Sequence, residues 1–244
     1  MKELKKLEHY IARRVGRAIH EYGMIEENDR VLVALSGGKD SWALLHVLHH
    51  LRKKAPVPFE LTAITVHPGF DQFSTHRIED FCREAGYAHF VERPNMREIL
   101  EDLYNPEDVY CPFCARLRRG VLYTVARREG FTKIALGHHA DDLIETLLMA
   151  EFFTGEIKSM PPLLKADDGV NVVIRPLCYV FERELTRFAE LTDFPILDCA
   201  CPMSGRLDLQ RHRVKRLLND LEAEHPGIKA NLLSCLGRVR TKHL

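Results

Sequence analysis

The sequence has no apolar stretch long enough to cross a membrane and no surplus of either charge. Acidic and basic residues balance at 35 each in 244 residues, so no overall electrostatic field indicates a nucleic acid or a lipid surface as the partner. The first 23 residues are charged at helical spacing and lack the apolar centre of a secretion signal. We therefore expect a cytoplasmic protein with no membrane partner, in which any RNA is bound by a local basic patch.

Internal repeats and low-complexity tracts are also absent, and a hydrophobic fraction of 45% suffices for the core of one α/β domain. Seven cysteines without a secretion signal argue against a disulfide framework, because reducing compartments keep thiols free. Three of them stand singly among apolar neighbours and are expected in the core: Cys82, Cys178 and Cys235. Metal or redox chemistry is the better explanation for the other four.

Short apolar runs alternate with amphipathic stretches along the chain. Strands are predicted at 30–36, 59–67, 88–93, 133–139 and 169–177, and helices at 40–53, 75–86, 113–128, from 141 onward and at 182–192. This alternation predicts a Rossmann-like α/β fold, a parallel sheet with helices on both faces and ligands at the carboxyl ends of the strands. An N-terminal helix (1–24) and a C-terminal helical extension (201–244) are expected to flank a central domain (25–200).

The sequence SGGKDS, residues 36–41, follows the first predicted strand and opens a helix. Unpaired backbone amides and the helix dipole favour an anion at such a position, and phosphate is the natural one. The residues expected to hold it are Ser36, Gly37, Gly38, Lys39 and Ser41. Asp40 is either a magnesium contact or an acid that favours the helix start. The spacing matches neither a Walker loop nor a dinucleotide fingerprint, so a different nucleotide loop is needed.

A second polar motif, LGHHADD, ends the fourth predicted strand. Its candidate site residues are Gly137, His138, His139, Asp141 and Asp142. They occupy the same edge of the sheet as Ser36 and are therefore expected to face the same crevice. Two carboxylates beside a nucleotide favour magnesium, and the structural alternative is a helix capped by Asp141 with a solvated Asp142.

Two close pairs of cysteines remain, Cys111 with Cys114 in CPFC and Cys199 with Cys201 in DCACP. Four thiols can hold zinc, three can hold an iron–sulfur cluster, and a pair at a helix start can be redox-active. Spacing alone favours structural zinc slightly and leaves open unrelated buried thiols.

The SGGKDS loop resembles the PP-loop of the N-type ATP pyrophosphatases, which cut ATP between its α and β phosphates. With the further segments CPFCARLRRGVLY, TKIALGHHADDLIETLLM, MPPLL, VIRPL and LQR, nearly the whole chain is similar to the tRNA 2-thiocytidine synthetase family. The resemblance implies an adenine nucleotide alpha hydrolase-like fold and the cofactors ATP, Mg²⁺ and a [4Fe–4S] cluster. It also implies a tRNA substrate, a sulfur donor of the cysteine-desulfurase type and a homodimer.

The same resemblance implies that the cluster is held by three cysteines, which here would be Cys111, Cys114 and Cys199, with one iron left open to carry sulfur. The chain departs from the family pattern downstream, where Cys199-Ala-Cys201-Pro replaces Cys-x-x-Cys-Gly and one extra residue precedes LQR. Cys201 is therefore an alternative third ligand, or a fourth that would close the cluster.

The implied reaction joins the C2 oxygen of an anticodon-loop cytidine to the α-phosphorus of ATP, releases pyrophosphate, and then replaces that oxygen by sulfur with loss of AMP. Lys39 and Asp141 are the expected catalytic residues, with Arg118 as a charge clamp or a plain exposed arginine. Basic segments at 114–128, 211–216 and 237–243 are candidate RNA contacts or merely solvated helix faces. Two other functions stay open: an ATP-dependent enzyme for another nucleoside or small molecule with structural zinc, and a zinc-containing module that senses ATP.

Overall fold

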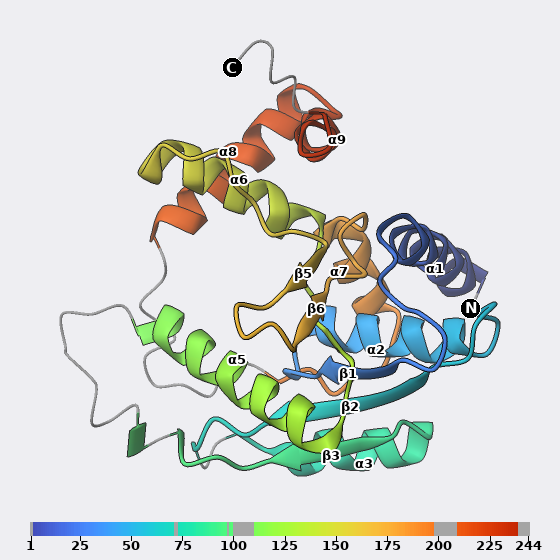
Figure 1. Cartoon of the computed structure of the whole chain (residues 1–244). Helices are drawn as coiled ribbons and strands as arrows, with labels where there is room; N and C mark the ends of the chain where they lie inside the picture. Colours follow the sequence, from blue (N-terminus) through green and yellow to red (C-terminus); the bar gives the residue numbers. More distant parts are fainter. Residues whose placement is uncertain (1, 71–72, 97, 100–109, 198–208, 239–244) are drawn as a thin grey trace.

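A computed structural model describes residues 2–70, 73–96, 98–99, 110–197 and 209–238. Six strands of this part form one sheet in the order β3-β2-β1-β4-β6-β5 (Figure 1). The strands are β1 (Arg30–Ala34), β2 (Glu60–Val66), β3 (His89–Glu92), β4 (Lys133–Ala135), β5 (Leu163–Lys165) and β6 (Val172–Ile174). All neighbours are parallel except β5 and β6. The predicted α/β class with a mostly parallel sheet is confirmed.

Strand β5 is the main difference from the prediction, because it is an antiparallel edge strand that the apolar pattern did not indicate. Two prolines precede it and only three residues pair, so its sequence carries little strand signal. The turn to β6 is closed by Asp168, whose Oδ1 accepts the backbone N–H groups of Val170 and Asn171. Gly169 takes a φ of +70° in this turn.

The helices described are α1 (Lys2–Tyr22), α2 (Lys39–Arg52), α3 (Thr75–Ala85), α5 (Tyr110–Glu129), α6 (Ala140–Thr154), α7 (Glu182–Glu190), α8 (Leu209–Glu224) and α9 (Ile228–Cys235). None of them is long and apolar enough to span a membrane. They agree with the predicted helices to within a few residues at the ends. The N-terminal helix ends at Tyr22, within the predicted range 1–24, and α8 and α9 lie in the predicted C-terminal helical extension.

The central strand β1 shows why the sheet is covered on both faces. Val31 and Val33 pack into the core shared with α1, α2 and α7, whereas Leu32 points to the opposite face and packs with Leu122 and Val125 of α5. Side chains alternate along a strand, so a run that is apolar at every position needs helices on both sides. Figure 1 shows α5 lying across one face and α1 and α2 beyond the other.

Helices α6, α8 and α9 form a separate apolar cluster beyond the sheet, visible in the upper part of Figure 1. Val214 and Leu218 of α8 pack there against Ile144 and Leu148 of α6. This packing places the polar face of α8 near the carboxyl ends of the strands. The SGGKDS and LGHHADD motifs follow β1 and β4 at the same edge of the sheet.

Candidate active site

The SGGKDS loop is shaped for an anion at the start of α2. Gly37 has a φ of +87°, and Gly38 is the N-cap of α2 with no side chain capping it. The Ser41 hydroxyl stabilises the loop by two hydrogen bonds. It accepts the Ser36 backbone N–H at 3.2 Å and donates to the Gly38 carbonyl at 2.8 Å. An uncapped helix start beside a left-handed glycine presents backbone amides to a ligand. The loop therefore fits a phosphate.

A cavity of about 430 Å³ opens at the carboxyl ends of β1 and β4. Most of the predicted site residues line it: Ser36, Gly38, Asp40, Ser41, Arg118, Gly137, His138 and Asp142, together with His139. Arg119 of α5 and Arg211 of α8 line it as well. The structure thus brings the loop and the LGHHADD motif to one cavity, as the sheet topology predicted, and α5 lines the same cavity. Gly37 and Lys39 belong to the loop but are not among the lining residues.

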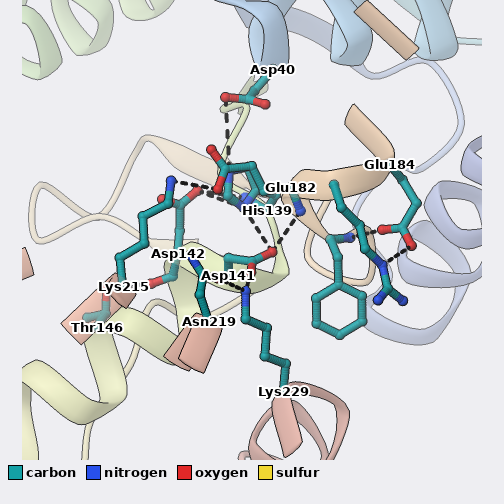
Figure 2. A network of polar contacts seen from close by, with 12 residues as sticks. Asp40, His139, Asp141, Asp142, Thr146, Glu182, Glu184, Lys215, Asn219 and Lys229 are labelled. Carbon is teal, nitrogen blue, oxygen red and sulfur yellow. Dashed lines mark hydrogen bonds and ion pairs between the residues drawn. The ribbon is translucent and has the colours of Figure 1, made fainter. Parts of the chain in front are cut away.

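The two neighbouring aspartates of LGHHADD face different surroundings. Asp142 lines the cavity, accepts the His139 backbone N–H at 2.9 Å and lies 3.9 Å from an Arg211 nitrogen. Asp141 is only 3% exposed and points toward α7 and α9 instead (Figure 2). Its carboxylate accepts the Glu182 backbone N–H and the Lys229 ammonium, both at 2.7 Å. In this geometry Asp141 holds helices together, whereas Asp142 faces the ligand space.

Lys39 is held by two carboxylates. Its ammonium lies 3.1 Å from Asp40 and 3.2 Å from Glu182, and Glu182 is 2.6 Å from the Lys215 ammonium. Burial raises the pKa of Glu182, but its contacts with Lys215 and Lys39 outweigh this effect and bring the pKa to about 2. Glu182 is therefore ionised at neutral pH and fixes the position of Lys39.

Glu182 is a site residue that sequence patterns do not reveal, because its segment carries only a helix pattern and nothing local indicates that α7 begins beside the loop. The basic segment 211–216 is a candidate RNA contact. The structure places Arg211 at the cavity and Lys215 on Glu182, and the RNA contact of this segment stays a prediction. In the basic segment 114–128, the Arg128 guanidinium donates two hydrogen bonds to the Glu92 carboxylate, at 3.1 and 2.9 Å.

His138 is a neutral, half-buried group on the cavity wall. Burial is the main reason that its pKa falls to about 4, so the ring carries no charge at neutral pH. Its Nδ1 is buried and has no hydrogen-bond partner within the part of the chain that the structure describes. A buried polar atom without a partner at a cavity wall is an unused hydrogen-bonding site, which fits a polar ligand.

Gly137 is required by close packing between the two motifs. A Cβ there would lie 3.1 Å from the Ser41 backbone nitrogen and 3.2 Å from the Asp40 carbonyl carbon. We expect Gly137→Ala to push the loop away from β4, lower the melting temperature and weaken ATP binding. Gly120→Ala on α5 is the matched control, since a Cβ there meets nothing within 4 Å. Calorimetric titration with ATP and thermal melts check this, and an unchanged Gly137→Ala protein would contradict it.

Glu145 of α6 is a buried acid near this site, only 4% exposed. Burial, followed by the negative charge of Asp142, raises its pKa from 4.5 to about 7. A raised carboxyl pKa means that the folded state keeps the proton longer than the unfolded state. The stabilising contribution is therefore present below pH 4.5 and is lost as the pH rises to about 7.

Glu145→Gln removes this titration. Relative to the unsubstituted protein, we expect the variant to gain about 3 kcal/mol in unfolding free energy as the pH rises through that window. Urea unfolding at pH 5 and pH 8 measures the change. Glu151→Gln, on the exposed side of the same helix, should show no such gain. A difference between Glu145→Gln and the parent that is independent of pH would refute the assignment.

The cysteines fall into three groups. Cys82 and Cys178 are buried in the core, which confirms their predicted place, whereas Cys235 is exposed and its predicted burial is wrong. Helix α9 packs through Leu232 and Leu233, which leaves Cys235 on the outer side.

Cys114 is 6% exposed, packs with Met96 and immediately precedes Ala115, which lines the cavity. Cys111 belongs to the first turn of α5, but its side chain lies outside the described residues, as do Cys199 and Cys201 entirely. Leu197, two residues before Cys199, donates its backbone N–H to the Gly37 carbonyl at 3.0 Å. The last described residue before Cys199 therefore lies beside the loop.

Comparisons with known proteins show the family of the chain. The profile of the PP-loop domain matches residues 7–204. The tRNA-cytidine(32) 2-sulfurtransferase of Geobacter sulfurreducens is 49% identical over 230 residues, which cover 94% of this chain and 90% of that enzyme. The enzyme of the same name from Anaeromyxobacter dehalogenans is 46% identical over 244 residues, covering 100% of this chain and 84% of the relative.

A solved structure is similar as well, that of the U34-tRNA thiolase NcsA from Methanococcus maripaludis with its [4Fe–4S] cluster. It superposes with a TM-score of 0.76 at 26% identity, over 97% of this chain and 82% of that one. The chain therefore belongs to the PP-loop family and, within it, to the tRNA-cytidine(32) 2-sulfurtransferases, and it is an enzyme of the transferase class.

Proposed function

We propose that the protein uses ATP to replace the C2 oxygen of cytidine 32 of tRNA by sulfur, releasing AMP and pyrophosphate. The observation that carries this proposal is the shared cavity, since the nucleotide loop, the LGHHADD motif and the turn after Cys114 all border it. An activated base and a sulfur source have to meet in one space, and this cavity supplies it. The names of the sulfurtransferase relatives support the substrate.

ATP fits the loop by its phosphates. The uncapped start of α2 and the left-handed Gly37 would receive the pyrophosphate end. Asp40 and Asp142 both line the cavity, and their carboxylates with phosphate oxygens form the all-oxygen ligand set that Mg²⁺ prefers. We therefore assign the magnesium role to Asp142 together with Asp40, and a positioning role to Asp141.

The chemistry needs the C2 oxygen to become a good leaving group. Attack of that oxygen on the α-phosphorus forms a C–O–P link and breaks the bond to pyrophosphate, and AMP later departs with the same oxygen. Lys39 would stabilise the charge that grows on the departing pyrophosphate, held in place by Glu182. Arg118 and Arg119 of α5 also line the cavity and would hold negative charge on the nucleotide or the RNA.

The sulfur source is assigned to the start of α5. A [4Fe–4S] cluster on Cys111, Cys114 and Cys199 would supply the sulfur that forms the C2–S bond, with Cys201 as the alternative third ligand. Burial of Cys114 beside a cavity-lining residue supports this assignment, as does the cluster in the similar tRNA thiolase. We also propose that a cysteine desulfurase-type donor reloads the sulfur and that the enzyme works as a homodimer.

The purified protein tests the proposal directly. Incubation with unmodified tRNA, ATP, Mg²⁺ and a sulfide source should give 2-thiocytidine on nuclease digestion and mass spectrometry, with AMP and pyrophosphate in equal amounts. Each product should disappear when ATP or tRNA is omitted. A thiolated small molecule or an unthiolated tRNA product would favour the competing ATP-dependent enzyme with structural zinc, and metal analysis of the anaerobically purified protein separates iron from zinc.

A further inference from the structure

A cluster of metal-ligating side chains lies outside the cavity, where α1 packs on α2. Glu8 of α1 and His46 and His50 of α2 each offer one ligand atom, and these atoms all lie within 4.8 Å of one another. None of the three lines the ATP cavity. His46 and His50 are four residues apart, so one helix face presents both imidazoles to the neighbouring helix.

A hydrogen bond fixes which ring nitrogen of His50 is available. The Nδ1 of His50 lies 2.9 Å from the carbonyl oxygen of His46, and because a carbonyl only accepts, this nitrogen carries the proton. The neutral ring then has its lone pair on Nε2. The Nδ1 of His46 lies 3.0 Å from the Tyr87 hydroxyl, and its Nε2 faces the Glu8 carboxylate at 3.3 Å.

Metal-binding histidines typically have their second nitrogen hydrogen-bonded in this way, since the outer partner sets the tautomer and the ring orientation. His46 is half-buried and burial lowers its pKa, which favours the neutral form that a metal needs. Both rings therefore already have the outer contacts of ligands.

We propose that Glu8, His46 and His50 bind a divalent first-row transition ion, with Zn²⁺ as the best match, and that this ion joins α1 to α2. Two imidazole nitrogens and one carboxylate oxygen are a donor set for zinc rather than for magnesium or calcium. Two ligands of one tetrahedral zinc ion lie about 3.4 Å apart, so atoms that now lie within 4.8 Å of one another must approach by up to about 1.4 Å to share the ion. His50 is exposed, which permits that shift and leaves a fourth position for water.

The ion would stabilise the packing of α1 against α2, the helix that begins at the nucleotide loop. Helix α2 runs from Lys39 at the loop to His46 and His50, and α1 lies against it. A metal that binds only the folded state stabilises it by mass action. The site is a structural clamp and is independent of the thiolation chemistry.

Untagged, cluster-loaded protein tests the site with Co²⁺ and Zn²⁺ as probes. We expect Co²⁺ to give visible bands of nitrogen and oxygen ligation without thiolate charge transfer, which separates this site from the cysteines. Zn²⁺ should raise the melting temperature. His50→Ala and Glu8→Gln should weaken binding by about 10–100-fold or more and remove the thermal shift, with thiolation unchanged.

His9→Ala is the matched control, because His9 is exposed, adjoins Glu8 and lies outside the cluster. It should bind both ions like the parent. His50 is exposed, so its replacement should leave the fold intact, and the melt without metal checks that. Thiolate bands, equal affinity in all four proteins, or no binding at micromolar Zn²⁺ would each overturn the proposal.

Discussion

Cys114→Ala should abolish tRNA thiolation while ATP binding persists. The thiol lies at the start of α5 and borders the cavity through the next residue, Ala115, whereas the nucleotide loop is built from residues 36–41. Loss of one of three cluster ligands should therefore remove bound iron and acid-labile sulfide without altering the phosphate cradle. We expect 2-thiocytidine to fall to the level of a protein-free control.

The matched control is Cys82→Ala. Cys82 is also buried, at 1% exposure, and burial raises the pKa of its thiol to about 12, so it is an inert core residue. Both substitutions create a similar small cavity in the protein. Iron content, 2-thiocytidine and ATP affinity should stay near the parental values in Cys82→Ala. Thiolation by Cys114→Ala at the parental rate would exclude a cluster at this cysteine.

Lys39→Met should slow the formation of AMP and pyrophosphate by about 10²–10³-fold, as expected when one electrostatic donor is lost from a transition state. The ammonium is the cation at the start of α2, and Glu182 and Asp40 hold it there. Because the backbone amides of the loop remain, ATP affinity should fall much less than turnover. Iron content should be unchanged, which separates this defect from that of Cys114→Ala.

Lys53→Met at the other end of α2 is the control for helix and charge effects, since this lysine is exposed at the C-cap. Glu182→Gln should show an intermediate loss, with kcat more affected than KM, because it leaves Lys39 in place but weakens its anchor. A Lys39→Met enzyme with parental turnover would mean that the loop only binds and does not assist the reaction.

Sequence patterns predict the site where polar motifs directly follow apolar strands. The SGGKDS loop and the LGHHADD motif both follow apolar strands, and parallel strands meet at one edge, so their common cavity could be predicted. The end of the fourth strand could not be predicted, because nothing in the sequence of residues 136–139 marks where the strand predicted at 133–139 stops. The structure ends β4 at Ala135 and uses Gly137 for the close approach to the loop.

Tertiary contacts decided what the sequence left open. Asp141 and Asp142 are equivalent in the pattern, and only the positions of α7 and α9 show that Asp141 bonds to Glu182 and Lys229. Glu182 itself could not be found, since its link to Lys39 spans 143 positions of sequence. The exposure of Cys235 likewise depends on which side of α9 packs.

The fate of one oxygen atom tests the reaction most directly. A tRNA carrying ¹⁸O at C2 of cytidine 32 is thiolated in a single turnover with ATP, and the released AMP is weighed by mass spectrometry. If the base oxygen attacks the α-phosphorus at the Lys39 loop, the AMP formed with each 2-thiocytidine carries the heavy oxygen. If the label appears in water instead, and AMP has its ordinary mass, the base was never adenylated and the shared cavity serves another chemistry.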